Sequence, residues 1–210
     1  MKTNKETIRA LFAVLLIVIL FLCFYFPNKI TEMKHSQQSF IQFTGKIQAR
    51  EDFLRSNFEL NSQMTGLKAP EMFCMITYSE GRLLSEMAKY NPVLIYWFTR
   101  QSCNDCIIDA LTELEKEIQN EVSENRDFVK ILCSHETDRE LMILRRTYKF
   151  SFPIYKVPSD AFKWVVEDNR KPYYFLVHPD MRISHIYVPD KEFPELNKLY
   201  LEGVKRFLLD

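Results

Sequence analysis

The sequence predicts an α/β domain with a mixed β-sheet flanked by helices, preceded by a membrane-spanning helix and a helical stalk. Three observations support this prediction. An uninterrupted apolar segment extends from Ala10 to Phe26. Between residues 73 and 166, β-prone runs alternate with amphipathic helical segments. Two further β-prone runs and a final helix follow, a pattern typical of an antiparallel hairpin in such a sheet.

The composition excludes several classes of protein. Of the 210 residues, 47% are hydrophobic and 27% are charged, so the chain can bury a core and is not disordered as a whole. Lys and Arg together number 28, as do Asp and Glu, which gives a formal net charge of zero. Without a basic excess, nucleic acid is not an expected partner. Five cysteines are too few for a fold built on disulfides.

The apolar segment predicts a membrane anchor over residues 1–28. The 19 uncharged residues from Ala10 to Asn28 would rise roughly 28 Å as a helix, close to the hydrocarbon thickness of a bilayer. A cleaved signal peptide is the main alternative, although no Ala-x-Ala site follows Phe26. A buried core helix is less favoured, because the segment has no polar face.

Basic residues before the apolar segment indicate its orientation. Lys2, Lys5 and Arg9 precede it, against one acidic residue, Glu6. Because positive residues stay on the cytoplasmic side, we expect a single-pass protein of the inner (plasma) membrane with a cytoplasmic N-terminus. The rest of the chain would then lie in the periplasm or an equivalent extracytoplasmic space, where disulfides persist.

Residues 29–66 predict a polar juxtamembrane helix, which we interpret as a stalk, and the folded domain is expected over 67–210. In this domain Val93 to Phe98 is a continuous apolar run, as in a strand buried on both faces. The other expected strands are at residues 73–78, 128–133, 152–157, 173–177 and 183–188. The expected helices are at residues 81–90, 103–122, 137–149, 159–166 and 195–209.

A C-x-x-C sequence, from Cys103 to Cys106, directly follows the buried strand and begins the long helix. The N-terminus of a helix carries unpaired N–H groups and partial positive charge, which favour a thiolate at the first cysteine. The second cysteine lies three residues further and can attack a mixed disulfide formed at the first. The pattern therefore predicts a dithiol–disulfide exchange site, with Cys103 as the attacking thiolate and Cys106 as the resolving thiol.

Two alternative interpretations of the C-x-x-C sequence stay open. A zinc site would need two more ligands at comparable spacing, and Cys133 and the histidines form no second pair. A structural disulfide would constrain little of the unfolded chain, because its ring is so small. Cys74 and Cys133 lie in predicted apolar strands, so we expect them to be inert core residues. We expect no metal and no cofactor beyond the Cys103–Cys106 disulfide.

Three further sequence features accompany the C-x-x-C: Ala69-Pro70 before the first strand, Trp97-Phe98-Thr99 before the C-x-x-C, and Lys171-Pro172-Tyr173-Tyr174-Phe175-Leu176-Val177 before a hairpin. With these features, residues 69–210 resemble the membrane-anchored, thioredoxin-like TlpA/ResA group of thiol–disulfide oxidoreductases. The resemblance implies a thioredoxin-like fold in which Pro172 has a cis peptide bond and faces the active disulfide. Lys171, Pro172 and Trp97 would then contact the substrate.

The chain departs from that family around the cysteines. Ser102 replaces an aromatic residue, and Asn104-Asp105 replaces Gly-Pro or a similar dipeptide. The Asp105 carboxylate opposes a thiolate at Cys103 and could cancel the ~1 kcal/mol that the helix N-terminus supplies, so we expect a dithiol on the reducing side. Trp97 stands where thioredoxins keep a buried Asp, a role that Glu86, Glu113 or a histidine could take.

Together these features predict a membrane-anchored thiol–disulfide oxidoreductase that exchanges or reduces disulfides in exported, cysteine-containing proteins. Its cycle would need a membrane electron donor for re-reduction. One alternative is a peroxidase-type redoxin, although the residues before Cys103 lack the Pro of a peroxidatic motif. The other is a non-catalytic binding or adaptor module that keeps the thioredoxin fold.

Overall fold

The computed structural model divides into two compact units, Met1–Asp52 and Phe53–Asp210. The residues that it describes are 3–76, 80–119, 128–134, 137–148, 152–158, 160–162 and 171–209. Parts of the helices and strands predicted at 73–78, 103–122, 137–149 and 159–166 therefore lie outside the described residues.

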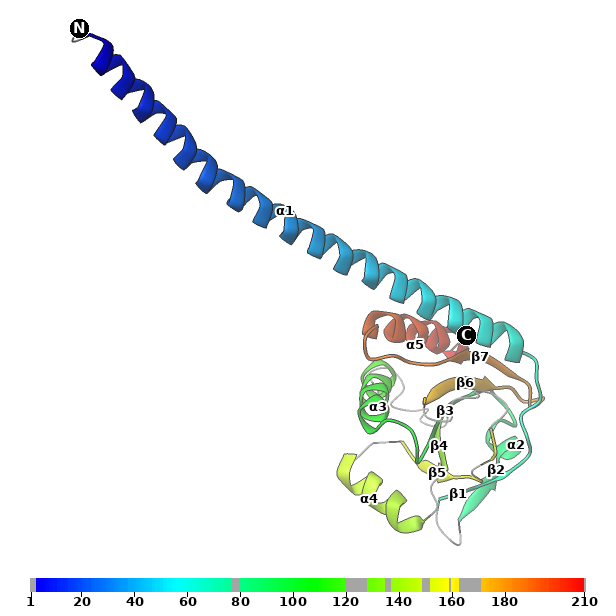
Figure 1. Ribbon diagram of the computed structural model, residues 1–210. Coiled ribbons are helices and arrows are strands. Elements are labelled where there is room, and N and C mark those ends of the chain that lie inside the picture. Colours follow the sequence, from blue (N-terminus) through cyan, green and yellow to red (C-terminus); the bar gives the residue numbers. More distant parts are fainter. Residues whose placement is uncertain are drawn as a thin grey trace. The chain divides into compact units, whose positions relative to one another are not determined.

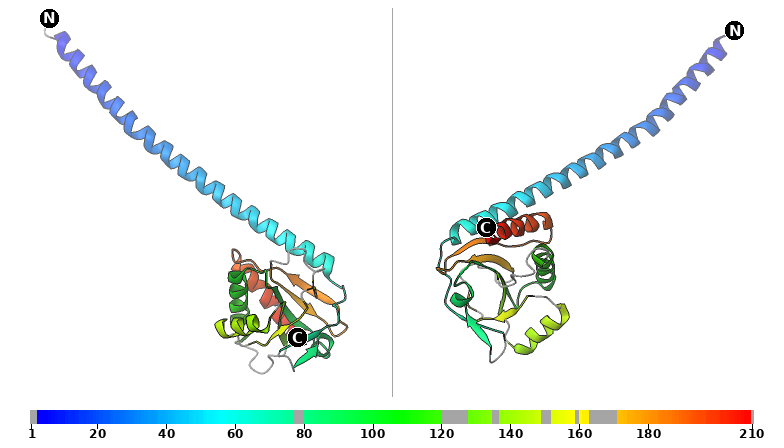
Figure 2. Two further views of the ribbon diagram at one scale, coloured as in Figure 1. Left: turned by 60° about the horizontal axis from the view of Figure 1, so that its bottom comes forward. Right: turned by 180° about the vertical axis from the view of Figure 1, so that it is seen from behind.

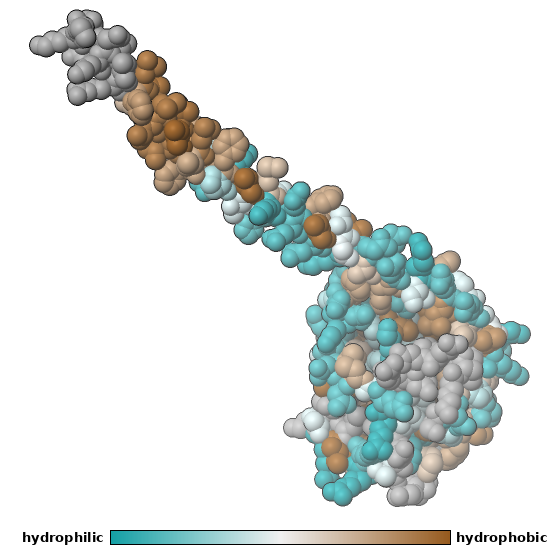
Figure 3. All heavy atoms as spheres, viewed as in Figure 1, coloured by the Kyte–Doolittle hydropathy of each residue, from teal (hydrophilic) through white to brown (hydrophobic). Residues whose placement is uncertain are grey.

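The first unit is formed by the N-terminal part of α1, a helix that extends over Thr3–Met64. Side chains from Leu11 to Arg50 are exposed, and apolar ones gather around the segment predicted as an anchor (Figure 3). This part of α1 is long and apolar enough to cross a membrane, judged by length and composition. The helix prediction for residues 29–64 is thus confirmed.

The second unit begins at Phe53, inside the segment that the sequence predicts as a stalk. Phe53 packs against one core of the domain, whereas Leu60 and Met64 pack against the other. Asn57 hydrogen-bonds both backbone groups of Val188, accepting from its N–H at 2.7 Å and donating to its carbonyl at 3.4 Å. The last turns of α1 are therefore part of the folded domain.

The second unit contains a mixed sheet with the strand order β2-β1-β5-β4-β3-β6-β7 (Figure 1). β4 is parallel to β3 and β5, and the other paired strands are antiparallel. The mixed sheet that the sequence predicts is confirmed. The strands are β1 Phe73–Met75, β2 Gly81–Leu83, β3 Val93–Thr99, β4 Val129–Ser134, β5 Ile154–Lys156, β6 Tyr173–Val177 and β7 Ile183–Tyr187.

Side chains on the two faces of the sheet enter two separate cores. On β3, Leu94, Tyr96 and Phe98 join the core that contains α3 and α5. Val93, Ile95 and Trp97 join the core on the opposite face, as the pleat of a strand requires. α3 and α5 pack side by side (Figure 2). The remaining helices are α2 Leu84–Met87, α3 Asn104–Gln119, α4 Asp138–Tyr148 and α5 Pro194–Leu209.

The helix predicted over residues 81–90 is wrong for its first turn. Gly81 instead pairs with Met75 in the β1–β2 hairpin, and only the short α2 follows. A Cβ atom at Gly81 would lie 2.4 Å from the ring of Phe73, so this pairing requires a glycine. The helical spacing of Leu83, Leu84 and Met87 misled the prediction, because only Leu84 and Met87 face a core, from a single turn, whereas Leu83 ends β2 and is exposed.

Candidate active site

Cys103 occupies the N-cap position of α3. Its carbonyl accepts the first helical hydrogen bond, from the N–H of Ile107 at 3.0 Å. Its Sγ accepts the backbone N–H of Cys106 at 3.5 Å, as an N-cap side chain does for the third residue of a helix. The Cys103 side chain is exposed. The structure thus places this sulfur where partial positive charge and open solvent coincide.

Hydrogen bonds lower the pKa of the Cys103 thiol below its usual value. The largest contribution comes from the side chain of Cys106, followed by the backbone N–H of Cys106. A hydrogen bond from the Asp105 backbone acts in the same direction, whereas the Asp105 carboxylate opposes the thiolate and has the smallest effect. The Asp105 carboxylate thus opposes the Cys103 thiolate as predicted, but the hydrogen bonds outweigh it and the pKa of Cys103 is lowered.

The environment of Cys106 has the opposite effect. Its side chain is half-buried, and burial is the largest cause that raises the pKa of its thiol to about 11. The hydrogen bond to Cys103 and the negative charge of a Cys103 thiolate add to this increase. Lys191 lowers this pKa and Asp190 raises it. The two thiols are therefore chemically different although three residues apart.

Ser102 stabilises the turn before Cys103. It stands where the TlpA/ResA group commonly has an aromatic residue. Its N–H donates to the carbonyl of Thr99 at 3.0 Å, and its hydroxyl accepts from the N–H of Thr99 at 3.0 Å. Both residues are buried. The end of β3 is thus closed by polar contacts, and the position of Cys103 relative to the strand is fixed locally.

Lys171 and Pro172 lie just before β6, whose Tyr173 pairs with Trp97 of β3. This antiparallel register puts them at the edge of the sheet where β3 ends and Cys103 follows. Lys171 is exposed and Pro172 is buried. No cis peptide bond occurs among the described residues, so the cis bond implied for Pro172 is wrong. The trans form is the more stable form of an X–Pro bond in general, by about 0.5–1 kcal/mol.

Trp97 is a core residue in the structure. Its side chain is 2% exposed and packs edge-on against the ring of Phe162 at 5.1 Å between centroids. It lies on the sheet face opposite to α3. Because the Trp97 side chain is buried, a substrate could contact almost none of its surface. The structure therefore does not support Trp97 as a residue that contacts the substrate.

Sequence reasoning did not identify the loop between β7 and α5 as part of the site. Asn197 holds this loop, accepting from the Tyr187 hydroxyl at 2.8 Å and donating to the Asp190 carbonyl at 2.9 Å. The loop brings the charges of Asp190 and Lys191 to Cys106. Beside it lies a cavity of about 320 Å³, lined by Asp109, Thr112, Glu113, Lys116, Lys191, Pro194 and Asn197. No local sequence pattern signals such a long-range contact.

The two acidic residues considered as substitutes for a buried Asp have other partners. The Glu86 carboxylate accepts from the N–H of Leu83 at the start of α2. Burial raises the pKa of Glu113, and a hydrogen bond from Asn197 partly offsets this. The charged side chains that act on the two cysteines are instead Asp105 at Cys103, and Lys191 and Asp190 at Cys106.

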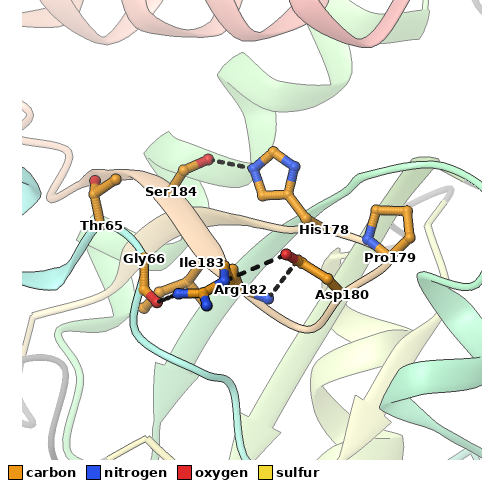
Figure 4. Close-up of a pocket in the computed structure, with 8 residues that line it drawn as sticks. All are labelled: Thr65, Gly66, His178, Pro179, Asp180, Arg182, Ile183 and Ser184. Atoms are coloured by element: carbon orange, nitrogen blue, oxygen red, sulfur yellow. Dashed lines mark hydrogen bonds and ion pairs between the residues drawn. The ribbon is translucent and has the colours of Figure 1, made fainter.

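A second cavity, of about 430 Å³, lies at the β6–β7 turn (Figure 4). His178 Nε2 is 2.7 Å from the hydroxyl of Ser184, and Arg182 donates to the carbonyl of Gly66 at 2.8 Å. This cavity lies at the end of β6 opposite to Pro172, so it is remote from the cysteines. Within the described residues, no three His, Cys, Asp or Glu side chains converge as a metal site would require.

Comparison with known proteins identifies the fold. No family model matches the sequence, and no curated protein matches it. Among solved structures, a thiol:disulfide interchange protein from a Bacteroides species is 17% identical, with a TM-score of 0.52, covering 70% of this chain and 91% of that one. The thioredoxin domain of a Bacteroides vulgatus thiol-disulfide oxidoreductase is 16% identical, with a TM-score of 0.50, covering 69% and 97%.

The fold is thioredoxin-like. A protein of this fold from Bacteroides thetaiotaomicron, assigned as a protein disulfide isomerase, is 18% identical with a TM-score of 0.54, covering 70% of this chain and 91% of its own. The thioredoxin-like fold predicted from the resemblance is thus confirmed. In this fold the Cys103–Cys106 pair lies at the junction of the buried strand β3 and helix α3.

Proposed function

We propose that the protein is a membrane-anchored thiol–disulfide oxidoreductase that exchanges or reduces disulfides in exported proteins. The observation that carries this proposal is the difference between the two thiols. Cys103 is exposed with a lowered pKa, whereas Cys106 is half-buried with a pKa raised to about 11. An attacking thiol must be accessible and ionised, and thiolate fraction controls its rate. The names of the similar structures support the same chemistry.

The reaction transfers two electrons to the substrate disulfide in two steps. The Cys103 thiolate attacks one substrate sulfur and forms a mixed disulfide, while the other substrate sulfur leaves as a thiolate and takes a proton from water. Cys106 then loses its proton to water and attacks the Cys103 sulfur. The Cys103–Cys106 disulfide forms, and the second substrate sulfur leaves as a thiolate.

The surroundings of Cys103 suit a protein substrate. The sulfur is exposed, and the exposed Lys171 lies at the same end of the sheet, beside the buried Pro172, so an extended substrate segment would contact Lys171. The cavity beside the β7–α5 loop would accept polar side chains of that substrate, because it presents both acidic and basic residues.

The N-terminal segment supplies the location in this proposal. The apolar part of α1 anchors the chain, and the basic residues before it keep the N-terminus in the cytoplasm. The redox domain then lies outside the inner membrane, where substrate disulfides occur. A membrane electron donor returns the Cys103–Cys106 disulfide to the dithiol.

Single serine variants of the two cysteines test the proposal. Cys103→Ser should lose disulfide reduction entirely and form no mixed disulfide, because no thiolate remains to attack. Cys106→Ser should accumulate mixed disulfides that mass spectrometry locates at Cys103, because the resolving thiol is missing. Cys74→Ala is the matched control and should retain the wild-type rate, because Cys74 is fully buried.

Two results would contradict the proposal. One is a Cys103→Ser variant that reduces disulfides at the wild-type rate. The other is a wild-type protein that consumes peroxide but leaves protein disulfides intact, which would favour the peroxidase alternative. Equilibration of the wild-type protein with glutathione gives the reduction potential, and a reversible two-electron couple is expected.

A further inference from the structure

The hydroxyl oxygen of Tyr96 is buried, and no described residue forms a hydrogen bond with it. The side chain is 0% exposed and lies on β3 in the core shared with α3. Among the residues that the structure describes, its hydroxyl is the buried side-chain polar atom without a hydrogen bond. Such a group costs roughly 1–3 kcal/mol when it is left unpaired, so its presence calls for a physical explanation.

The neighbouring tyrosine shows that this core can satisfy a hydroxyl. Tyr174 lies on the adjacent strand β6, with its ring centroid 4.8 Å from that of Tyr96. Its hydroxyl donates to the carbonyl of Ala110 on α3 at 2.8 Å. Ala110 is one helical turn beyond Cys106, so the two rings lie under the first turns of α3 and only one of them has a hydrogen-bond partner.

The charged groups that act on the Tyr96 hydroxyl belong to the active site. After burial, a Cys106 thiolate has the largest effect in raising the pKa of Tyr96, followed by Asp109 and a Cys103 thiolate. The phenol therefore stays protonated and is a hydrogen-bond donor at every working pH. The pKa of Cys106 is itself affected by Cys103, Lys191 and Asp190.

We propose that the Tyr96 hydroxyl donates a hydrogen bond to the Cys106 thiolate during the resolving step. In the dithiol form the Cys106 thiol is instead hydrogen-bonded to the Cys103 sulfur. Once Cys103 is engaged in a mixed disulfide, it is no longer a thiolate that can accept this bond. Cys106 must then lose its proton in a half-buried site, where a hydrogen-bond donor would stabilise the resulting anion in addition to the charge of Lys191.

This inference rests on the proposed function, because it assigns a role within the second step of that reaction. Tyr96 takes no proton and no electron in it. The Cys106 proton goes to water, the Cys106–Cys103 bond forms, and the substrate thiolate leaves, as in the reaction described above.

The test uses an aromatic disulfide reagent that releases one coloured thiolate for each step. Full-length protein in detergent, with Cys23→Ala to remove the exposed cysteine of α1, is mixed with the reagent, and both releases are followed over a range of pH. The first release reports attack by Cys103 and the second reports resolution by Cys106. Tyr96→Phe should leave the first rate unchanged and slow the second about tenfold near neutral pH.

Tyr174→Phe is the matched control, because it removes the hydroxyl of the adjacent ring, which donates to the carbonyl of Ala110. It should leave both rates unchanged. A structural role for Tyr96 would not separate the two steps, and removing an unpaired hydroxyl should raise the thermal midpoint rather than lower it. The pH profile of the second release should also shift upward in Tyr96→Phe, because the Cys106 thiolate loses its donor.

Three outcomes would overturn the inference: an unchanged second rate in Tyr96→Phe, equal slowing of both rates, or the same slowing in Tyr174→Phe. Failure of the proposed function would look different. In that case the wild-type protein itself would show no second release, or would show one that persists in Cys106→Ser.

Discussion

Four cysteines of the thioredoxin-like domain fall into two pairs with opposite physical settings. Cys103 and Cys106 lie at the start of α3, one exposed and one half-buried. Cys74 and Cys133 lie in strands and are each 0% exposed. They also belong to different cores, on opposite faces of the sheet, so they cannot pair with one another. The prediction that both are core residues is confirmed.

The comparison shows how position alone controls thiol chemistry. Burial raises the pKa of Cys74 to about 12, with a further increase from the charge of Glu71. At Cys103 the hydrogen bonds of a helix N-terminus lower the pKa, and there is little burial to oppose them. The same side chain is therefore a nucleophile at the end of β3 and an apolar packing group inside β1.

The largest effect is expected in alkylation of the native protein near neutral pH. Cys103 should react first, because it is exposed and ionises most readily. Cys74 and Cys133 should react at least ~10³-fold more slowly, because a fully buried thiol is exposed only through unfolding. Mass spectrometry of peptides over time measures each rate. Rapid labelling of Cys74 in folded protein would contradict the burial that the structure shows.

Much of this contrast could be predicted from the sequence. The continuous apolar run from Val93 to Phe98 predicts a buried strand, and the C-x-x-C after it predicts the helix start that activates Cys103. The strand at Tyr173–Val177 has the predicted bounds. These predictions succeed because each depends on local pattern: periodicity, apolar length and the chemistry of a helix N-terminus.

What the sequence could not supply depends on contacts between distant residues. Lys191 reaches Cys106 only because Asn197 holds the β7–α5 loop. Phe53 belongs to the domain because it packs on a core assembled mainly from residues beyond position 93. Gly81 pairs in a hairpin because only a glycine fits beneath Phe73. The partners of the first two contacts lie tens of residues apart, and the third depends on the backbone pairing of a hairpin, so residue patterns alone reveal none of them.

A smaller effect should follow from removal of the Cys106 side chain. Cys106→Ala deletes the hydrogen bond that contributes most to lowering the pKa of Cys103, so this pKa should rise toward its ordinary value. The thiolate fraction near neutral pH then falls, and the alkylation rate of Cys103 should drop several-fold. The pH profile of that rate should move to higher pH. Cys106→Ser is the control, because its hydroxyl can still donate; an equal shift in both variants would show that the hydrogen bond is not the cause.

The smallest effect concerns the carboxylate between the two cysteines. Asp105→Asn removes a charge that raises the pKa of Cys103 but keeps the backbone N–H that lowers it. The pKa of Cys103 should therefore fall further, and alkylation near neutral pH should accelerate by less than the change seen in Cys106→Ala, because an exposed charge is screened by water and salt. The acceleration should diminish at high ionic strength, whereas the effect of Cys106→Ala should persist, since a hydrogen bond is hardly screened. A slower rate in Asp105→Asn would mean that the carboxylate supports the helix start more than it opposes the thiolate, and the order of effects at Cys103 would have to be reversed.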